Sequence, residues 1–152
     1  MAPGDDLPDL AVATTSGPLS LRDLRGAPAV IYFYPKDATP GCTREAVDFA
    51  GLQARFQAAG ARVLGVSRDS IASHERFRSR QGLGFDLVSD PEQSMCEAFG
   101  VIGEKSMYGR IVVGIVRSTF LFGADGRLRQ AWRGVRVPGH AEQVLAAVEA
   151  LA

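Results

Sequence analysis

The chain has 152 residues, with 17 basic and 17 acidic side chains, a formal net charge of zero and 46% hydrophobic residues. This length suits a single domain over residues 1–152, and the composition is that of a globular chain rather than a disordered one. A neutral chain lacks the long-range attraction on which nucleic-acid binding normally depends, so we expect no nucleic-acid partner. We also expect no membrane partner, because apolar runs such as Ala29–Tyr34 are far shorter than the roughly 20 residues that span a bilayer.

The predicted elements begin with a short hairpin in the segment Met1–Gly26, which is rich in proline, glycine and aspartate. A run of β-branched and aromatic residues predicts a buried strand over Ala29–Tyr34. Apolar residues at spacings of three and four then predict a helix from about Thr43 to Ala59. A second strand over Ala61–Ser67 and a second helix over Ile71–Gln81 continue this alternation.

The second half of the chain predicts a strand, a helix, a two-stranded hairpin and a final helix. Their ranges are Phe85–Ser89, Pro91 to about Gly100 (with Asp90 and Gln93 at a capped start), Ile111–Phe122 with Leu128–Trp132, and the segment from Gly139. The turn signal Gly123–Gly126 separates the two strands of the hairpin. A parallel first half followed by an antiparallel hairpin predicts an α/β fold with a mixed central sheet flanked by helices.

Cys42 is the first candidate functional residue, because it falls between a strand that ends at Pro35 and the first turn of a long helix. Free backbone N–H groups at a helix start favour an anion, and the thiolate is the reactive form of cysteine. Thr39 adds a hydroxyl beside the sulfur, and Pro35 and Pro40 stiffen the loop. Most free cysteines are buried packing residues, but this position favours a reactive thiol.

Arg117 is the second candidate, because it interrupts an otherwise apolar predicted strand. A buried arginine is costly unless it meets an anion or several acceptors. One interpretation is an edge-strand arginine that reaches solvent. The other makes Arg117 the cation that stabilises the Cys42 thiolate and orients substrate oxygens.

The other residues with catalytic or binding potential form no clear motif. His74 and His140 are far apart in sequence and lack the spacing of metal ligands. We therefore expect no metal site, and the chain contains neither a phosphate-binding loop nor a dinucleotide-binding glycine pattern. With two cysteines and no visible secretory signal, we expect a protein of the reducing cytoplasm.

The segment Tyr32–Glu45 resembles the active-site segment of the peroxiredoxins, and is especially similar to the peroxiredoxin Q group, also called bacterioferritin comigratory protein. The resemblance continues through Gly103–Gly109, Gly114–Leu121 and Gly139–His140, and so covers nearly the whole chain. It implies a thioredoxin-like fold with an N-terminal β-hairpin extension. It also implies thiol-dependent reduction of hydrogen peroxide and organic hydroperoxides.

The same resemblance assigns roles to four side chains. Cys42 would be the peroxidatic nucleophile and would become a sulfenic acid. Thr39 and Arg117, with backbone N–H groups near Gly41, would hold both peroxide oxygens and stabilise the developing charge. Pro35 would shield the sulfur from water. No metal or organic cofactor is implied, because the thiolate supplies the electrons.

The chain departs from the family at the resolving cysteine. The two places where relatives carry it hold Val47 and Arg78, and the only other thiol is Cys96, which we interpret as a small core residue. This predicts a one-cysteine mechanism in which an external thiol (thioredoxin, glutaredoxin or a small thiol) reduces the sulfenic acid. The alternative is a Cys42–Cys96 disulfide formed after local unfolding, which requires the two Cα atoms to come within about 7 Å.

Two further expectations follow from the resemblance. Relatives of this group are often monomers, so we expect a monomer or a weak homodimer. A different class of function would use the same cysteine, as a peroxide sensor or a redox-switched binding protein.

Overall fold

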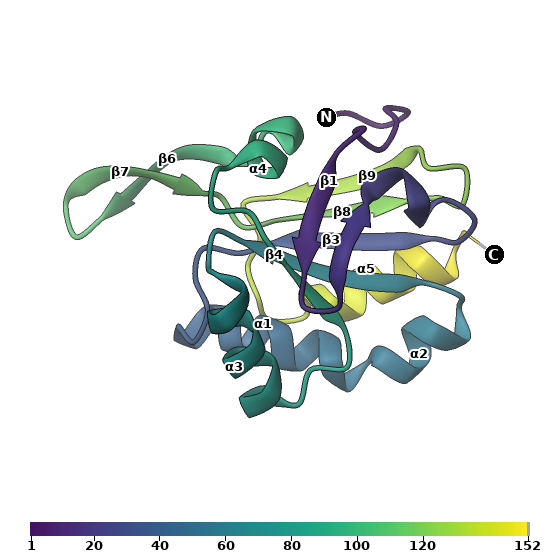
Figure 1. The fold of residues 1–152 in the computed structure, drawn as a ribbon, viewed down its shortest axis with the longest axis horizontal. Coiled ribbons are helices and arrows are strands. Elements are labelled where there is room, and N and C mark those ends of the chain that lie inside the picture. The colour runs from purple at the N-terminus through teal and green to yellow at the C-terminus, as the bar shows by residue number, and fades with distance from the viewer. Residues whose placement is uncertain (152) are drawn as a thin grey trace.

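The structure, a computed structural model, describes residues 1–151 and, within them, every side chain except that of Met107. A central sheet of seven strands has the order β2-β1-β5-β4-β3-β8-β9 (Figure 1). These strands are β1 Ala11–Thr14, β2 Gly17–Ser20, β3 Ala29–Phe33, β4 Arg62–Ser67, β5 Asp86–Ser89, β8 Ser118–Phe122 and β9 Leu128–Arg133. The helices are η1 Leu21–Leu24, α1 Pro40–Gly51, α2 Gln53–Ala58, α3 Ile71–Gln81, α4 Ser94–Phe99 and α5 His140–Glu149.

The sheet is mixed, as predicted. Strand β4 pairs in parallel with both β3 and β5, whereas β8 pairs antiparallel with β3 and with β9. The N-terminal hairpin β1–β2 extends the sheet, because β1 pairs antiparallel with β5. The predicted α/β fold with an N-terminal hairpin is therefore confirmed.

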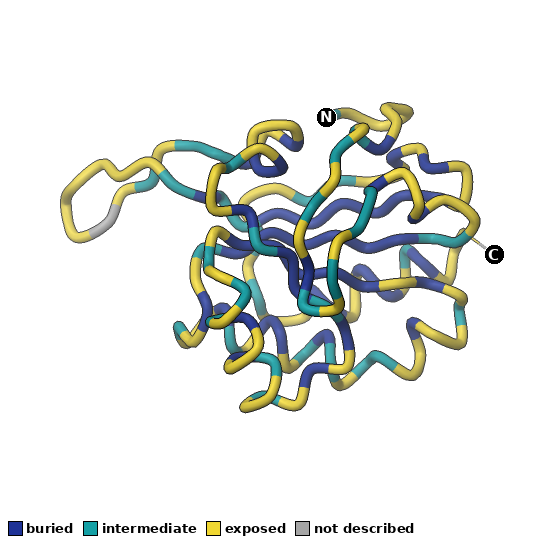
Figure 2. Tube along the Cα trace, viewed as in Figure 1, coloured by how far each residue is buried: buried dark blue, intermediate teal, exposed yellow. Residues whose placement is uncertain are grey.

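The sheet separates two hydrophobic cores, and the alternation of side chains along β3 supplies both. Tyr32 faces the core formed with α1, α2, α3 and α5, whereas Ile31 and Phe33 face the core formed with α4 and η1. Figure 2 shows the central strands as a buried layer with exposed chain on either side. The two cysteines belong to different cores, Cys42 to the first and Cys96 to the second.

The prediction of one continuous strand over Ile111–Phe122 is wrong, because Val116 and Arg117 belong to no strand and divide the segment in two. Its first part is β7, Arg110–Ile115, which pairs with β6, Ile102–Met107, in a separate two-stranded sheet. This β6–β7 ribbon projects from the body of the molecule (Figure 1). The break occurs where the backbone N–H of Val116 donates to Val101 O and the chain then turns into β8.

Two predicted helices also have different bounds. The helix expected over Thr43–Ala59 begins earlier, at Pro40, and is divided at Leu52 into α1 and α2. Gly51 precedes this break, consistent with the low helix propensity of glycine. The helix expected from Pro91 begins at Ser94, because the Asp90 carboxylate accepts from N–H groups one turn further on, at Met95 and Cys96. No helix within residues 1–151 is long and apolar enough to cross a membrane.

Candidate active site

The loop between β3 and α1 places Cys42 at a helix start. Thr39 has extended backbone angles at the N-cap, Pro40 is the first helical residue, and Cys42 follows two positions later. Proline suits this place because its missing N–H has no intrahelical partner to lose. The Cys42 residue is only 2% exposed, so its sulfur lies at the free N–H end of α1 in a largely dry setting.

Arg117 brings a positive charge to this sulfur from between β7 and β8. Its Nη2 donates to Cys42 Sγ at 3.4 Å, and its side chain is 17% exposed. The Arg117 side chain therefore faces the Cys42 sulfur rather than solvent. Gly41 makes room for this approach, because a Cβ added there would lie 3.3 Å from Nη2.

Glu45 is the second partner of Arg117, and no sequence pattern assigned it a role. Arg117 Nη1 donates to Glu45 Oε1 at 2.7 Å, whereas Oε2 is buried without a hydrogen-bond partner among the described residues. Burial raises the pKa of Glu45 to about 7, although the Arg117 charge opposes this shift. For Arg117, burial lowers the pKa, but Glu45 and Cys42 outweigh this and raise it overall. One guanidinium thus serves both a carboxyl group and a sulfur.

Thr39 and Pro35 lie on the same loop but have different surroundings. The Thr39 hydroxyl donates to Lys36 O at 2.8 Å, a bond that closes the loop on itself and leaves the oxygen lone pairs free to accept. Pro35 is half-buried directly after the buried Tyr34. Between them, Ala38 has a φ of 62°, a left-handed conformation that is uncommon for a residue with a Cβ.

Lys105 is a further residue near the sulfur that the sequence did not reveal. It lies on β6, and burial followed by the charge of Arg117 lowers its pKa, whereas Cys42 acts in the opposite direction. The ribbon therefore adds a second cation near the sulfur. Glu45 could have been found from its spacing, because residues three apart share one helix face; Lys105 gave no such signal.

Cys96 is as buried as Cys42 but has an acidic neighbour where Cys42 has a cation. It is completely buried in α4, and its backbone N–H donates to Asp90 Oδ2 at 2.7 Å. Burial, followed by the neighbouring Asp90, raises the pKa of its thiol. A neutral thiol on the far side of the sheet from Cys42 is a poor nucleophile for a disulfide.

These features can be set against known proteins. Residues 3–131 match the AhpC/TSA family. The chain belongs to this family. It is 53% identical to Peroxiredoxin Bcp of Xanthomonas campestris pv. campestris over 154 residues, covering 96% of each chain. It is 42% identical to Peroxiredoxin Bcp of Bacillus subtilis, covering 93% of this chain and 91% of the relative.

Solved structures agree with the sequence relatives. A cysteine-to-serine mutant of Xylella fastidiosa PrxQ matches with a TM-score of 0.94 at 46% identity, covering 99% of this chain and 97% of the other. The Xanthomonas campestris Bacterioferritin Comigratory Protein matches with a TM-score of 0.91 at 50% identity, covering 99% of both chains. The resemblance to the peroxiredoxin Q group and the thioredoxin-like fold are thereby confirmed. This peroxiredoxin is a thiol-dependent peroxidase, with a peroxide as substrate and a thiol as reductant.

Proposed function

We propose that this peroxiredoxin is a one-cysteine enzyme in which Cys42 reduces hydrogen peroxide and organic hydroperoxides. The observation that carries the proposal is the Arg117 guanidinium, held 3.4 Å from the Cys42 sulfur and fixed on its other side by Glu45. A fixed cation beside the sulfur attracts the oxygens of a peroxide and stabilises the negative charge that develops on the leaving oxygen.

The reaction begins when the Cys42 thiolate attacks the outer oxygen of the peroxide. An S–O bond forms as the O–O bond breaks, and the leaving oxygen takes a proton and departs as water or an alcohol. Arg117 and the backbone N–H groups of Gly41 and Cys42 stabilise the negative charge on that oxygen. The Thr39 hydroxyl donates to Lys36 O, so its oxygen is free to accept a hydrogen bond from the peroxide, and Pro35 limits the access of water.

An external thiol completes the cycle. Its sulfur attacks the sulfenic sulfur of Cys42, water leaves, and a mixed disulfide forms; a second thiol then releases Cys42 and forms the donor's own disulfide. Cys96 lies in the other core, and Val47 and Arg78 carry no thiol, which supports a donor from outside the chain. We assign this donor to thioredoxin, glutaredoxin or a small thiol.

The substrate range and the cellular location are inferred from a relative and from the state of the cysteines. The Xanthomonas campestris Bacterioferritin Comigratory Protein has alkyl peroxide reduction activity, which supports organic hydroperoxides as substrates here. Both cysteines are free in the structure, as in proteins of reducing compartments, which supports the cytoplasm.

Substitution of each cysteine tests the proposal. We expect Cys42→Ser to abolish thiol-dependent consumption of hydrogen peroxide and of cumene hydroperoxide, because a hydroxyl is not a comparable nucleophile. Cys96→Ser is the matched control and should keep most of the activity. Full activity in Cys42→Ser would refute the mechanism, and loss of turnover with normal sulfenic acid formation in Cys96→Ser would make Cys96 the resolving residue.

A further inference from the structure

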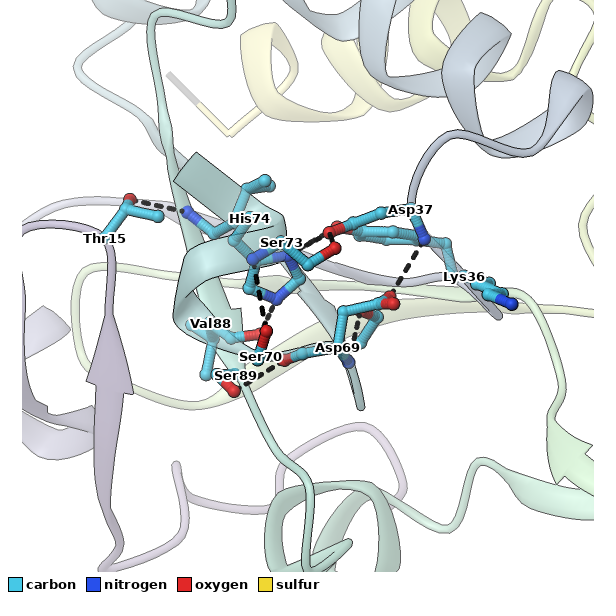
Figure 3. Close-up of polar contacts among 12 residues, drawn as sticks. Thr15, Lys36, Asp37, Asp69, Ser70, Ser73, His74, Val88 and Ser89 are labelled. Carbon is cyan, nitrogen blue, oxygen red and sulfur yellow. Dashed lines mark hydrogen bonds and ion pairs between the residues drawn. The ribbon is translucent and has the colours of Figure 1, made fainter. Parts of the chain in front are cut away.

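The side chain of Asp37 anchors the loop that carries Thr39 to the neighbouring elements. Its Oδ1 accepts from the Tyr34 hydroxyl at 2.6 Å, and its Oδ2 accepts from Ser73 Oγ at 2.8 Å. The same Oδ2 lies 2.8 Å from His74 Nδ1 (Figure 3). Asp37 is buried, and these contacts join the loop to Tyr34, directly after β3, and to α3.

The backbone of Asp37 is anchored as well. Its N–H donates to Asp69 Oδ2 at 2.9 Å (Figure 3). That carboxylate also accepts from Ser67 Oγ at the end of β4. Asp37 therefore fixes the loop through both its side chain and its main chain, because the partners of both lie outside the loop. The next residue, Ala38, has the left-handed φ of 62°, which needs such support because it carries a steric cost.

The protonation of His74 follows from its partners. The ring is completely buried; Nε2 lies 2.9 Å from Val88 O, and Nδ1 lies 2.8 Å from the Asp37 carboxylate. A carbonyl oxygen can only accept, and so can an ionised carboxylate, so both ring nitrogens must carry hydrogen. With Asp37 ionised, the hydrogen bonds at both ring nitrogens make its contact with His74 an ion pair, which lies between the loop, α3 and β5.

The state of Asp37 agrees with this assignment. Burial raises the pKa of Asp37, but hydrogen bonds from His74, Tyr34 and Ser73 outweigh it and hold the pKa below its usual value. Asp69 is the other acidic group at the cluster, and its carboxylate is engaged by Ser67 and by the Asp37 N–H. Both nitrogens of His74 are occupied by hydrogen bonds, so the three side chains do not form a metal site as arranged.

We propose that the Asp37–His74 ion pair is a positioning device for peroxide reduction: it holds the Pro35–Thr39 loop, and with it the start of α1, in the geometry that the reaction at Cys42 requires. The effect of the pair on catalysis rests on the proposed function of Cys42. Whether Asp37 and His74 form an ion pair is a separate question of protonation. Neither residue touches the sulfur, so both are positioning residues rather than catalytic ones.

The pair makes specific demands on substitutions. His74→Gln leaves the Asp37 carboxylate buried without its counter-charge, which is more damaging than losing one hydrogen bond. Asp37→Asn is compatible with a neutral His74, because the amide can donate to Nδ1 while Nε2–H still donates to Val88 O. Combining the two substitutions removes both charges, so the double variant should recover part of what His74→Gln loses.

The first measurement concerns protonation and does not require activity. In ¹⁵N NMR spectra of the folded protein at pH 7, both ring nitrogens of His74 should give the signals of protonated nitrogen. In Asp37→Asn, Nδ1 should give the signal of an unprotonated nitrogen. A neutral His74 in the wild-type protein would overturn the ion pair.

The second measurement concerns positioning. We expect His74→Gln to slow oxidation of Cys42 by hydrogen peroxide by about tenfold to a hundredfold, the cost of a small misplacement of reacting groups. Alkylation of Cys42 by iodoacetamide should change much less, because it does not need the two oxygens of a peroxide to be oriented. The double variant Asp37→Asn with His74→Gln should react with peroxide faster than His74→Gln alone.

Arg78→Gln is the matched control, because Arg78 lies on the same helix and its Nε donates to Phe85 O at 3.0 Å. It should lower stability without slowing peroxide oxidation. The positioning proposal is wrong if His74→Gln reacts like the wild type, if Arg78→Gln slows oxidation equally, or if the double variant is no faster than His74→Gln. Failure of the wild-type protein to consume peroxide would instead contradict the proposed function, and the NMR signals would still decide whether the pair exists.

Discussion

Arg117 is the residue that connects the chemistry of the site to its packing. Its two terminal nitrogens face different groups, Cys42 Sγ and Glu45 Oε1, so any shift of the guanidinium changes both contacts. A substitution that moves the guanidinium should therefore change activity in a way that stability does not follow, and Gly41 allows this to be tested. Glu45 allows the effect of the buried carboxyl partner on stability to be tested.

We predict that Gly41→Ala slows peroxide oxidation of Cys42 by roughly tenfold while leaving stability unchanged or higher by up to about 1 kcal/mol. The new Cβ would lie 3.3 Å from Arg117 Nη2, a tight contact that moves the guanidinium, whereas alanine favours the helix. Stopped-flow oxidation and urea unfolding measure the two effects. Gly51→Ala is the control, because a Cβ there meets nothing within 4 Å; equal slowing in both variants would rule out displacement of Arg117 as the cause.

Glu45 predicts a pH dependence of stability. Its pKa of about 7 in the folded protein lies above the unfolded value of 4.5, so the folded state binds more protons between these pH values. Stability should therefore fall as pH rises from about 4.5 to 7, by up to about 3 kcal/mol. In Glu45→Gln this contribution disappears. Urea unfolding across this range checks the difference; if the exposed Glu149→Gln flattens the curve as much as Glu45→Gln does, burial of Glu45 is not the cause.

At the scale of elements, the sequence predicts best where local signals agree. The helix over Ile71–Gln81 is observed with the predicted bounds, because Ser70 caps its start and Gly82 takes the left-handed conformation at its end. The buried strand β3 is likewise evident from its β-branched and aromatic residues. Both elements carry their start and stop signals within a few residues.

Elements defined by distant partners were missed. The β6–β7 ribbon is largely exposed, with Ile111 at 73% and Val113 at 67%, so its apolar residues do not alternate between a buried and a solvated face. The sequence pattern therefore predicted one continuous strand where the structure has β7 and β8. The Arg117 side chain at the break contacts Glu45 and Cys42, residues more than 70 positions away, and local periodicity contains no information about them.

The candidate site shows the same division. Cys42, Thr39, Pro35 and Arg117 could be singled out from the sequence because they belong to a recognisable segment or interrupt a pattern. The Asp37–His74 contact that anchors the loop could not be predicted, because the two residues are 37 positions apart and His74 matches no metal-ligand spacing. Hydrogen bonds between separate elements become visible only when the fold brings them together.

At the scale of the whole molecule, the sheet separates Cys42 from Cys96, and this predicts the product of oxidation. After one equivalent of hydrogen peroxide, intact mass spectrometry should show the gain of one oxygen atom, and a sulfenic-acid trapping reagent should label Cys42. Cys96→Ser should give the same product. A loss of two hydrogen atoms in the wild type, absent from Cys96→Ser, would instead show a Cys42–Cys96 disulfide and contradict the one-cysteine proposal.

The division of the interior into two cores also has a consequence for the supply of reducing thiols. Under the one-cysteine proposal, an oxidised molecule has no thiol of its own that can reach Cys42, because Cys96 lies behind the sheet, and it regains its reduced form only through a donor. Its throughput in a cell then cannot exceed the rate at which donors arrive. Such a protein removes peroxide only as quickly as the surrounding metabolism can deliver electrons to it.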